Sequence, residues 1–175
     1  MKPFKLIENL SIVVAILAFG IMSGFFWTYT FNVNLAMLNV DGQTYAQMQS
    51  LFNENVRHSM FFIFFFGGGA FSLLALVINF RHIKHASFWL LAIAVLIYIL
   101  GVIFFTAQVN LPLNEYTESW DPDSLPADWT TTRNAWNHAN AIRVATSFTS
   151  FVLCVLALCI RCSHAPNENQ VDSNN

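Results

Sequence analysis

The chain has 175 residues, of which 55% are hydrophobic and only 10% are charged, and its mean hydropathy is +0.50. In a soluble domain about a quarter of the residues are charged, so this composition argues against a soluble enzyme. A disordered chain is excluded, because it would have low hydrophobicity and high charge. The net charge of −2 provides no basic footprint for nucleic acid, and three cysteines are too few for a disulfide scaffold. The composition therefore predicts a small integral membrane protein of one domain.

Four apolar stretches are long enough for a helix to cross the hydrocarbon core, which takes about 20 residues. They predict an all-α fold, a four-helix transmembrane bundle with two longer extracytoplasmic loops. The four expected helices cover about 8–28, 58–80, 87–108 and 125–161. Residues 1–161 are expected to form a single membrane domain, followed by a disordered polar cytoplasmic tail over 162–175.

The distribution of Lys and Arg between the loops predicts the orientation in the membrane. With both termini inside, five basic residues lie on the inner side and only Arg57 and Arg133 on the outer side. We therefore expect a protein of the plasma (inner) membrane with both termini cytoplasmic. The short connection from Arg81 to Ala86 predicts that the second and third helices are antiparallel neighbours.

Polar and aromatic residues recur at steps of three and four along the last helix. At 100° per residue they stay within a sector of about 100°, and unpaired polar groups in hydrocarbon are costly. This stripe should therefore face other helices or a cavity. Its members are Trp129, Arg133, Trp136, Asn140, Arg143, Ser147, Ser150 and Cys154.

Two arginines on this stripe are the strongest functional signal, because ionisable residues inside a membrane usually face a partner or a cavity. The alternative is structural: Arg143 snorkels to the outer surface, and Arg133 lies above it and pairs with an acid such as Glu115. The spacing alone leaves both interpretations open.

Aromatic and basic residues of the other helices suggest a pocket in the outer half of the bundle. Gly67, Gly68 and Gly69 leave room either for another backbone or for a flat ligand. Apolar walls with a few polar groups suit a small-molecule site. The residues expected to line it are Trp136, Trp129, Arg57, Phe64 and Trp27.

The second half of the chain carries a pattern that resembles a known family. Pro112-Leu113-Asn114 follows the third helix, and a Trp/Arg/Trp/Asn/Arg series leads into the last one. Together with the chain length and the four-helix layout, this pattern is similar to the anthrone oxygenase-like family of small membrane proteins. The resemblance implies oxidation of anthrones to anthraquinones with molecular oxygen, as in fungal members, although most bacterial members have no assigned substrate.

Anthrone oxidation requires particular chemical groups, and the sequence offers candidates for some of them. Removal of a proton from the central ring carbon gives a carbanion that reduces oxygen directly, and the developing oxyanion needs a positive or hydrogen-bonding group. Arg143 and Arg133 are candidates for that group, and Asn140 and Asn114 for fixing the substrate's oxygens. No base is assigned, because His138 lies about 180° from the stripe.

We therefore expect an oxygenase, of monooxygenase type, acting on a flat, lipophilic, phenol-like or quinone-like molecule. The alternative is a non-enzymatic binder of lipid or quinone, or an accessory subunit of a larger membrane complex. The sequence does not require a cofactor, and it does not exclude a bound haem or flavin. We expect no metal site. The expected partners are a lipophilic small molecule and the bilayer, with a homo-oligomer left open.

Overall fold

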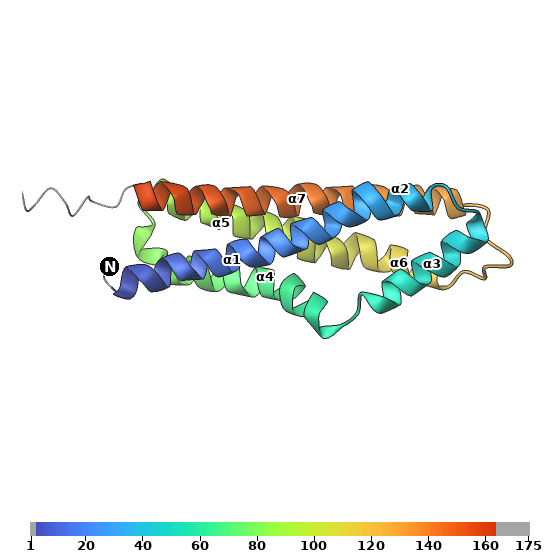
Figure 1. The fold of residues 1–175 in the computed structure, drawn as a ribbon, viewed down its shortest axis with the longest axis horizontal. Helices are drawn as coiled ribbons and strands as arrows, with labels where there is room; N and C mark the ends of the chain where they lie inside the picture. Colours follow the sequence, from blue (N-terminus) through green and yellow to red (C-terminus); the bar gives the residue numbers. More distant parts are fainter. Residues whose placement is uncertain (1–2, 164–175) are drawn as a thin grey trace, which may run out of the picture.

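The structure is a computed structural model that describes residues 3–163. Within this range the long apolar runs of the sequence form helices. The helices run side by side in an elongated bundle, with the beginning of the first helix and the end of the last at the same end (Figure 1). The elements in chain order are α1 (Pro3–Thr28), η1 (Tyr29–Val33), α2 (Asn34–Met37), α3 (Gly42–Asn55), α4 (Ser59–Ile78), η2 (Phe80–His82), α5 (Ala86–Tyr98), η3 (Ile99–Phe104), η4 (Thr106–Asn110), α6 (Leu111–Glu118) and α7 (Trp129–Ser163).

Within the described residues, four helical spans are long and apolar enough to cross a membrane. Side chains on their outer faces are apolar and exposed, as lipid contact requires: Leu17 is 59% exposed and Val77 is 69% exposed. The chain is an integral membrane protein with an all-α fold. The spans are Phe4–Met37, Ser59–Ile78, Ala86–Glu118 and Trp129–Ser163.

The bundle closes because each long helix has two neighbours. Helix α1 packs against α4 and α7, and α5 packs against the same two helices. The short 3₁₀ turn η2 joins α4 to α5, in agreement with the antiparallel pair that the short connection predicts.

Three spans differ in length from the sequence expectation. The first continues past residue 28 through η1 and α2, and the third continues past residue 108 through η4 and α6. Both continuations are too polar for a hydropathy pattern to detect, yet π-helical turns keep the backbone hydrogen-bonded. The last span begins at Trp129 rather than near 125. The residues just before it form a turn, in which the Trp129 amide donates to the Pro126 carbonyl at 3.1 Å. Of the predicted tail over 162–175, Cys162 and Ser163 belong to α7, and the remainder lies outside the described residues.

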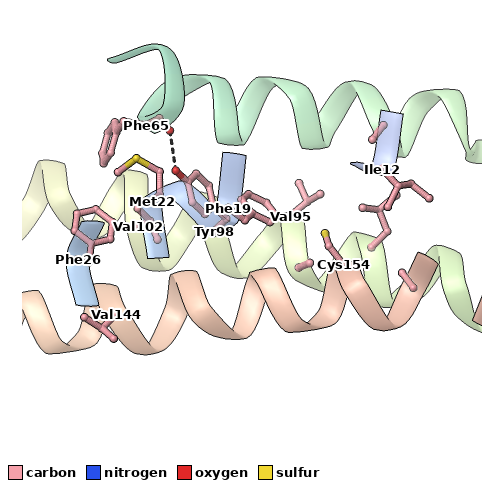
Figure 2. Close-up of a cluster of buried hydrophobic side chains, with 14 residues drawn as sticks. Ile12, Phe19, Met22, Phe26, Phe65, Val95, Tyr98, Val102, Val144 and Cys154 are labelled. Atoms are coloured by element: carbon pink, nitrogen blue, oxygen red, sulfur yellow. Dashed lines mark hydrogen bonds between the residues drawn. The ribbon is translucent and has the colours of Figure 1, made fainter. Parts of the chain in front are cut away.

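The apolar core lies where α1, α4, α5 and α7 meet (Figure 2). The Phe19 and Tyr98 rings lie 4.4 Å apart, and the Tyr98 hydroxyl donates to the Phe65 carbonyl at 3.0 Å. A Cβ atom added to Gly68 would come within 2.7 Å of the Tyr98 hydroxyl. The space at Gly68 is therefore filled by the Tyr98 ring.

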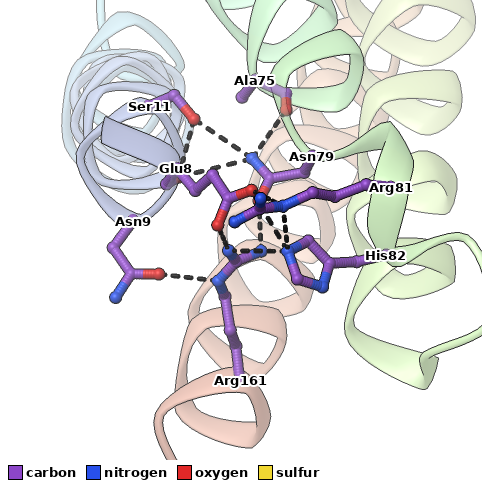
Figure 3. Close-up of polar contacts among 8 residues, drawn as sticks. All are labelled: Glu8, Asn9, Ser11, Ala75, Asn79, Arg81, His82 and Arg161. Atoms are coloured by element: carbon purple, nitrogen blue, oxygen red, sulfur yellow. Dashed lines mark hydrogen bonds and ion pairs between the residues drawn. The ribbon is translucent and has the colours of Figure 1, made fainter. Parts of the chain in front are cut away.

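At the end of the bundle where α1 begins, a buried carboxylate ties three parts of the chain together (Figure 3). Glu8 is fully buried, forms ion pairs with Arg81 and Arg161, and lies 3.2 Å from the His82 Nε2. Asn79 donates to the Glu8 carbonyl and accepts a hydrogen bond from Arg161. We call these five residues the Glu8 cluster. It links α1, the α4–α5 connection and the end of α7, and it forms because a buried carboxylate requires partners.

Candidate functional site

The polar stripe of α7 faces the interior of the bundle. Its members from Trp136 to Cys154 are buried, whereas Phe148 and Leu156 on the other sides of the helix are 46% and 45% exposed. The polar groups are thereby shielded from the hydrocarbon, as the spacing predicts.

Arg143 lies at the centre of this stripe and is 7% exposed. Its Nη2 donates to the Asn140 Oδ1 at 2.6 Å, and the Asn140 amide in turn donates to the Thr30 hydroxyl at 2.7 Å. The guanidinium lies over the Phe26 ring, with 4.6 Å between Cζ and the ring centroid. Arg143 is thus held inside the bundle by a neutral amide and an aromatic face.

Trp136 joins α7 to the third span. Its indole Nε1 donates to the Asn114 Oδ1 at 2.7 Å, its ring lies 5.0 Å from the Tyr29 ring, and the Arg143 Cζ is 5.6 Å from its centroid. We call Tyr29, Thr30, Asn114, Trp136, Asn140 and Arg143 the Arg143 cluster. Four of its members were expected from the sequence as site residues, and the structure brings them together: Asn114, Trp136, Asn140 and Arg143.

Helical irregularities lie beside this cluster. The π-helical segment η1 supplies Tyr29 and Thr30, and η4 ends at Asn110, one turn before Asn114. Such π-bulges are rare and occur frequently at functional sites. The spacing of residues on an ideal α-helix did not indicate Tyr29, Thr30 or Asn110. The one available signal is that polar side chains interrupt an otherwise apolar run.

Several buried polar atoms on the spans that form the cluster have no hydrogen-bond partner among residues 3–163. Native proteins contain few such atoms, and each carries a desolvation cost. On the spans that form the cluster, the unpartnered atoms are Asn34 Nδ2, Thr106 Oγ1, Asn110 Nδ2, Asn110 Oδ1 and Arg143 Nε.

Two of the expected site residues lie in a separate cluster at the end of the bundle where α7 begins. The Arg133 guanidinium packs over the Trp129 and Tyr45 rings, at 4.9 and 5.8 Å from their centroids. Burial raises the pKa of Tyr45, and the nearby Arg133 opposes this only in part. Arg133 and Trp129 therefore pack against Tyr45 of α3, and their role in the site stays a prediction.

The three other expected residues lie away from the Arg143 cluster. Trp27 is 49% exposed and packs against Phe31 on the outside of the bundle. Arg57 is exposed and pairs with Glu118. Phe64 packs against the apolar core. Trp27 and Asn34 would share one side of an ideal α-helix, but the π turn η1 between them shifts the register, and Asn34 is buried while Trp27 is not.

The structure does not place an obvious base beside Arg143. His138 is exposed, and the His58 ring accepts a hydrogen bond from the Phe61 amide at the start of α4. Among the buried polar side chains of the described residues, the single carboxylate is that of Glu8. It lies about 27 Å along the helix from Phe26, at 1.5 Å per residue. Over the same residues, no group of three or more His, Cys, Asp or Glu side chains is placed to hold a metal ion.

An open groove of about 480 Å³ lies between α3 and α6, outside the Arg143 cluster. Thr117 in its wall accepts a hydrogen bond from Asn53, which in turn accepts one from Gln49. Gln49 accepts from the Tyr29 hydroxyl at 3.4 Å. A chain of polar contacts thus connects the groove to the cluster. The groove is lined by Ala46, Gln47, Ser50, Leu51, Thr117, Glu118, Trp120 and Pro122.

A protein-family model described as anthrone oxygenase matches residues 48–153, more than half of the chain. The match includes Asn114, Trp136, Asn140 and Arg143, but not α1 and η1, which contribute Tyr29 and Thr30 to the cluster. No curated protein and no solved structure matches the chain. The chain belongs to the anthrone oxygenase family.

Proposed function

We propose that this member of the anthrone oxygenase family is a membrane oxygenase that oxidises a flat, lipophilic, phenol-like or quinone-like molecule at the Arg143 cluster. Family membership supports the reaction class, and the family's name makes anthrone the first substrate to test. We further propose that both termini lie on the cytoplasmic side, as the distribution of basic residues predicts.

The observation that carries the proposal is a buried cation without a carboxylate partner. The described ion pairs do not include Arg143, whose hydrogen bond goes to the neutral Asn140 amide. An unpaired charge inside a membrane bundle is costly and usually marks a functional site. An anionic oxygen that forms during the reaction would provide the missing countercharge.

The reaction then needs little from the protein beyond positioning and charge. A base takes a proton from the ring methylene of anthrone, and the electron pair moves onto the carbonyl oxygen, beside Arg143. The carbanion form reduces O₂ and forms a C–O bond, which gives a hydroperoxide after protonation. Loss of the second C–H proton with cleavage of the O–O bond yields the new carbonyl and water. One oxygen atom enters the quinone and the other leaves as water.

Arg143 stabilises the negative oxygen only once it has formed, and this is the kind of interaction that accelerates a reaction. Trp136, Tyr29 and Phe26 present aromatic faces around the guanidinium. These faces are suited to hold a flat ring system. Asn114 fixes the Trp136 indole through its hydrogen bond.

The proposal is tested by anthrone-dependent oxygen uptake with the purified protein in nanodiscs. Removal of one oxyanion-stabilising donor typically lowers turnover about 100-fold or more, so Arg143→Met should cost at least that much. Arg143→Lys, which retains the charge, should keep part of the activity. Asn114→Ala should also lower turnover, whereas Asn55→Ala should not, because the Asn55 side chain is exposed and donates to the Leu51 carbonyl of its own helix.

Unchanged turnover in both Arg143→Met and Asn114→Ala would overturn the site. If the wild-type protein shows no turnover alone but is purified with a bound lipophilic molecule or a larger complex, the protein is a binder or accessory subunit instead. A visible absorption spectrum of the same sample identifies any bound haem or flavin.

A further inference from the structure

The Asn110 side chain is buried without the partners that an amide requires. It is 0% exposed, and neither its Nδ2 nor its Oδ1 has a hydrogen-bond partner among the described residues. Thr106, four residues earlier at the start of η4, has a buried hydroxyl in the same condition. Leaving such groups unpaired destabilises the folded protein. A leucine at Asn110 would fill a similar volume without that cost.

The register of the helices places these two residues at about the same level along the bundle as the Arg143 cluster. Asn114 receives the hydrogen bond of Trp136, and Thr146 donates to the Gly101 carbonyl at 3.0 Å. Because the third span and α7 run antiparallel, residues between Gly101 and Asn114 lie opposite residues between Trp136 and Thr146. Asn110 therefore lies at about the level of Asn140, and Thr106 at about the level of Arg143.

A second observation points to the same wall of the bundle. The third span contains two π-helical segments, η3 and η4, and Thr106 and Asn110 are the first and last residues of η4. An irregular helix with unpaired polar side chains is a departure from the most stable arrangement. Departures of this kind gather where a ligand binds.

We propose that Asn110 and Thr106 bind the oxygen-bearing edge of the substrate. This inference rests on the proposed function and specifies its substrate class. An amide offers an acceptor and a donor side by side. The matching ligand edge therefore carries two neighbouring oxygens, of which one donates and one accepts a hydrogen bond. The Arg143 Nε, also buried and unpartnered, supplies a further donor to an oxygen of the same ligand.

The test compares two probes on the protein in nanodiscs, with empty nanodiscs as the blank for partitioning. One probe is 1,2-dihydroxyanthraquinone, which has such an edge, and the other is anthraquinone, which has carbonyls but no donor. A hydrogen-bonded pair in a buried site is worth about 1.4 kcal/mol, or about tenfold in affinity. The wild-type protein should therefore prefer the dihydroxy probe by about tenfold.

Asn110→Leu should reduce this preference to about one, and Thr106→Val should reduce it severalfold. A folding defect would weaken the binding of both probes alike and leave the ratio of their affinities unchanged. The ratio therefore reports on recognition of the dihydroxy edge. Because Asn110→Leu removes an unpaired amide, its thermal unfolding midpoint should stay constant or rise by about 2–4 °C.

Two matched variants complete the comparison. Thr146→Val removes a hydroxyl that bonds to the Gly101 carbonyl, and it should lower the unfolding midpoint without changing the ratio. Asn55→Leu alters an exposed amide and should leave the ratio unchanged.

This inference is overturned if the wild-type protein binds the two probes about equally. It is also overturned if Asn110→Leu retains the tenfold preference for the dihydroxy probe. If anthrone-dependent oxygen uptake persists in either case, the proposed function stands without it. If the wild-type protein binds neither probe and takes up no oxygen with anthrone, both proposals are overturned. Bound water alone at Asn110 would leave the ratio near one, and so is among the contradicting results.

Discussion

Replacing Glu8 with leucine should destabilise the bundle more than any exposed carboxylate substitution. The Glu8 carboxylate is 0% exposed, and the Arg161 side chain with which it pairs is 8% exposed. Without the carboxylate, the partners that remain to Arg161 among the described residues are the Asn9 and Asn79 amides and the His82 ring. Removing one partner of a buried pair costs about 3–5 kcal/mol, which corresponds to a fall of roughly 10 °C in the unfolding midpoint.

The assay is thermal unfolding in detergent, followed by circular dichroism at 222 nm. The matched control is Glu118→Gln, because Glu118 pairs with Arg57, whose side chain is 44% exposed; such pairs contribute less than about 1 kcal/mol. The double variant Glu8→Leu/Arg161→Leu should be less destabilised than the sum of the single variants, since neither charge is left alone. Equal effects of Glu8→Leu and Glu118→Gln, or strict additivity in the double variant, would refute this reasoning.

Three further results are expected. Gly101→Ala should lower the unfolding midpoint, because its Cβ would come within 2.5 Å of the Thr146 side chain; Gly24→Ala, whose Cβ meets nothing within 4 Å, should leave the midpoint unchanged or raise it slightly. Burial and the nearby Arg161 lower the pKa of His82 in the folded protein. Neutral His82 therefore contributes fully to stability above the pKa of about 6.5 that it has in the unfolded chain, and this contribution is lost as pH falls through its lower pKa in the folded protein. A pH series of unfolding midpoints checks this, and His82→Gln should abolish that part of the pH dependence while His85→Gln retains it. The Thr44 amide and hydroxyl hold the pKa of Asp41 below its usual range, so α3 should lose this cap as pH falls below about 4, and hydrogen exchange of the first turn of α3 should accelerate in Asp41→Ala at neutral pH.

The sequence was sufficient to predict the four-helix layout and the inward-facing stripe of α7. Steps of three and four residues between Trp136, Asn140 and Arg143 fix one face of a regular helix, and a membrane leaves polar groups no other place than the interior. The family resemblance drew attention to Asn114, which the structure joins to Trp136 through a hydrogen bond.

Other features depend on information that a helical pattern does not contain. The π turn at η1 changes the register after Trp27, so Trp27 and Asn34, which would share one side of an ideal α-helix, differ in burial. Asn110 lies two residues beyond the predicted third helix, 87–108, and carried no periodic signal. The partners of Glu8 are more than 70 residues away along the chain, and only the packed bundle shows that this border residue is buried.

We propose that this protein transfers oxygen from O₂ to a flat lipophilic substrate beside Arg143. The most direct measurement is single-turnover oxidation of anthrone under ¹⁸O₂, with mass analysis of the quinone and with the wild-type protein, Arg143→Met and empty nanodiscs in parallel. We expect one ¹⁸O atom to enter each quinone, at a rate that falls to near the empty-nanodisc rate in Arg143→Met. Quinone formation at the same rate in all three samples would contradict it.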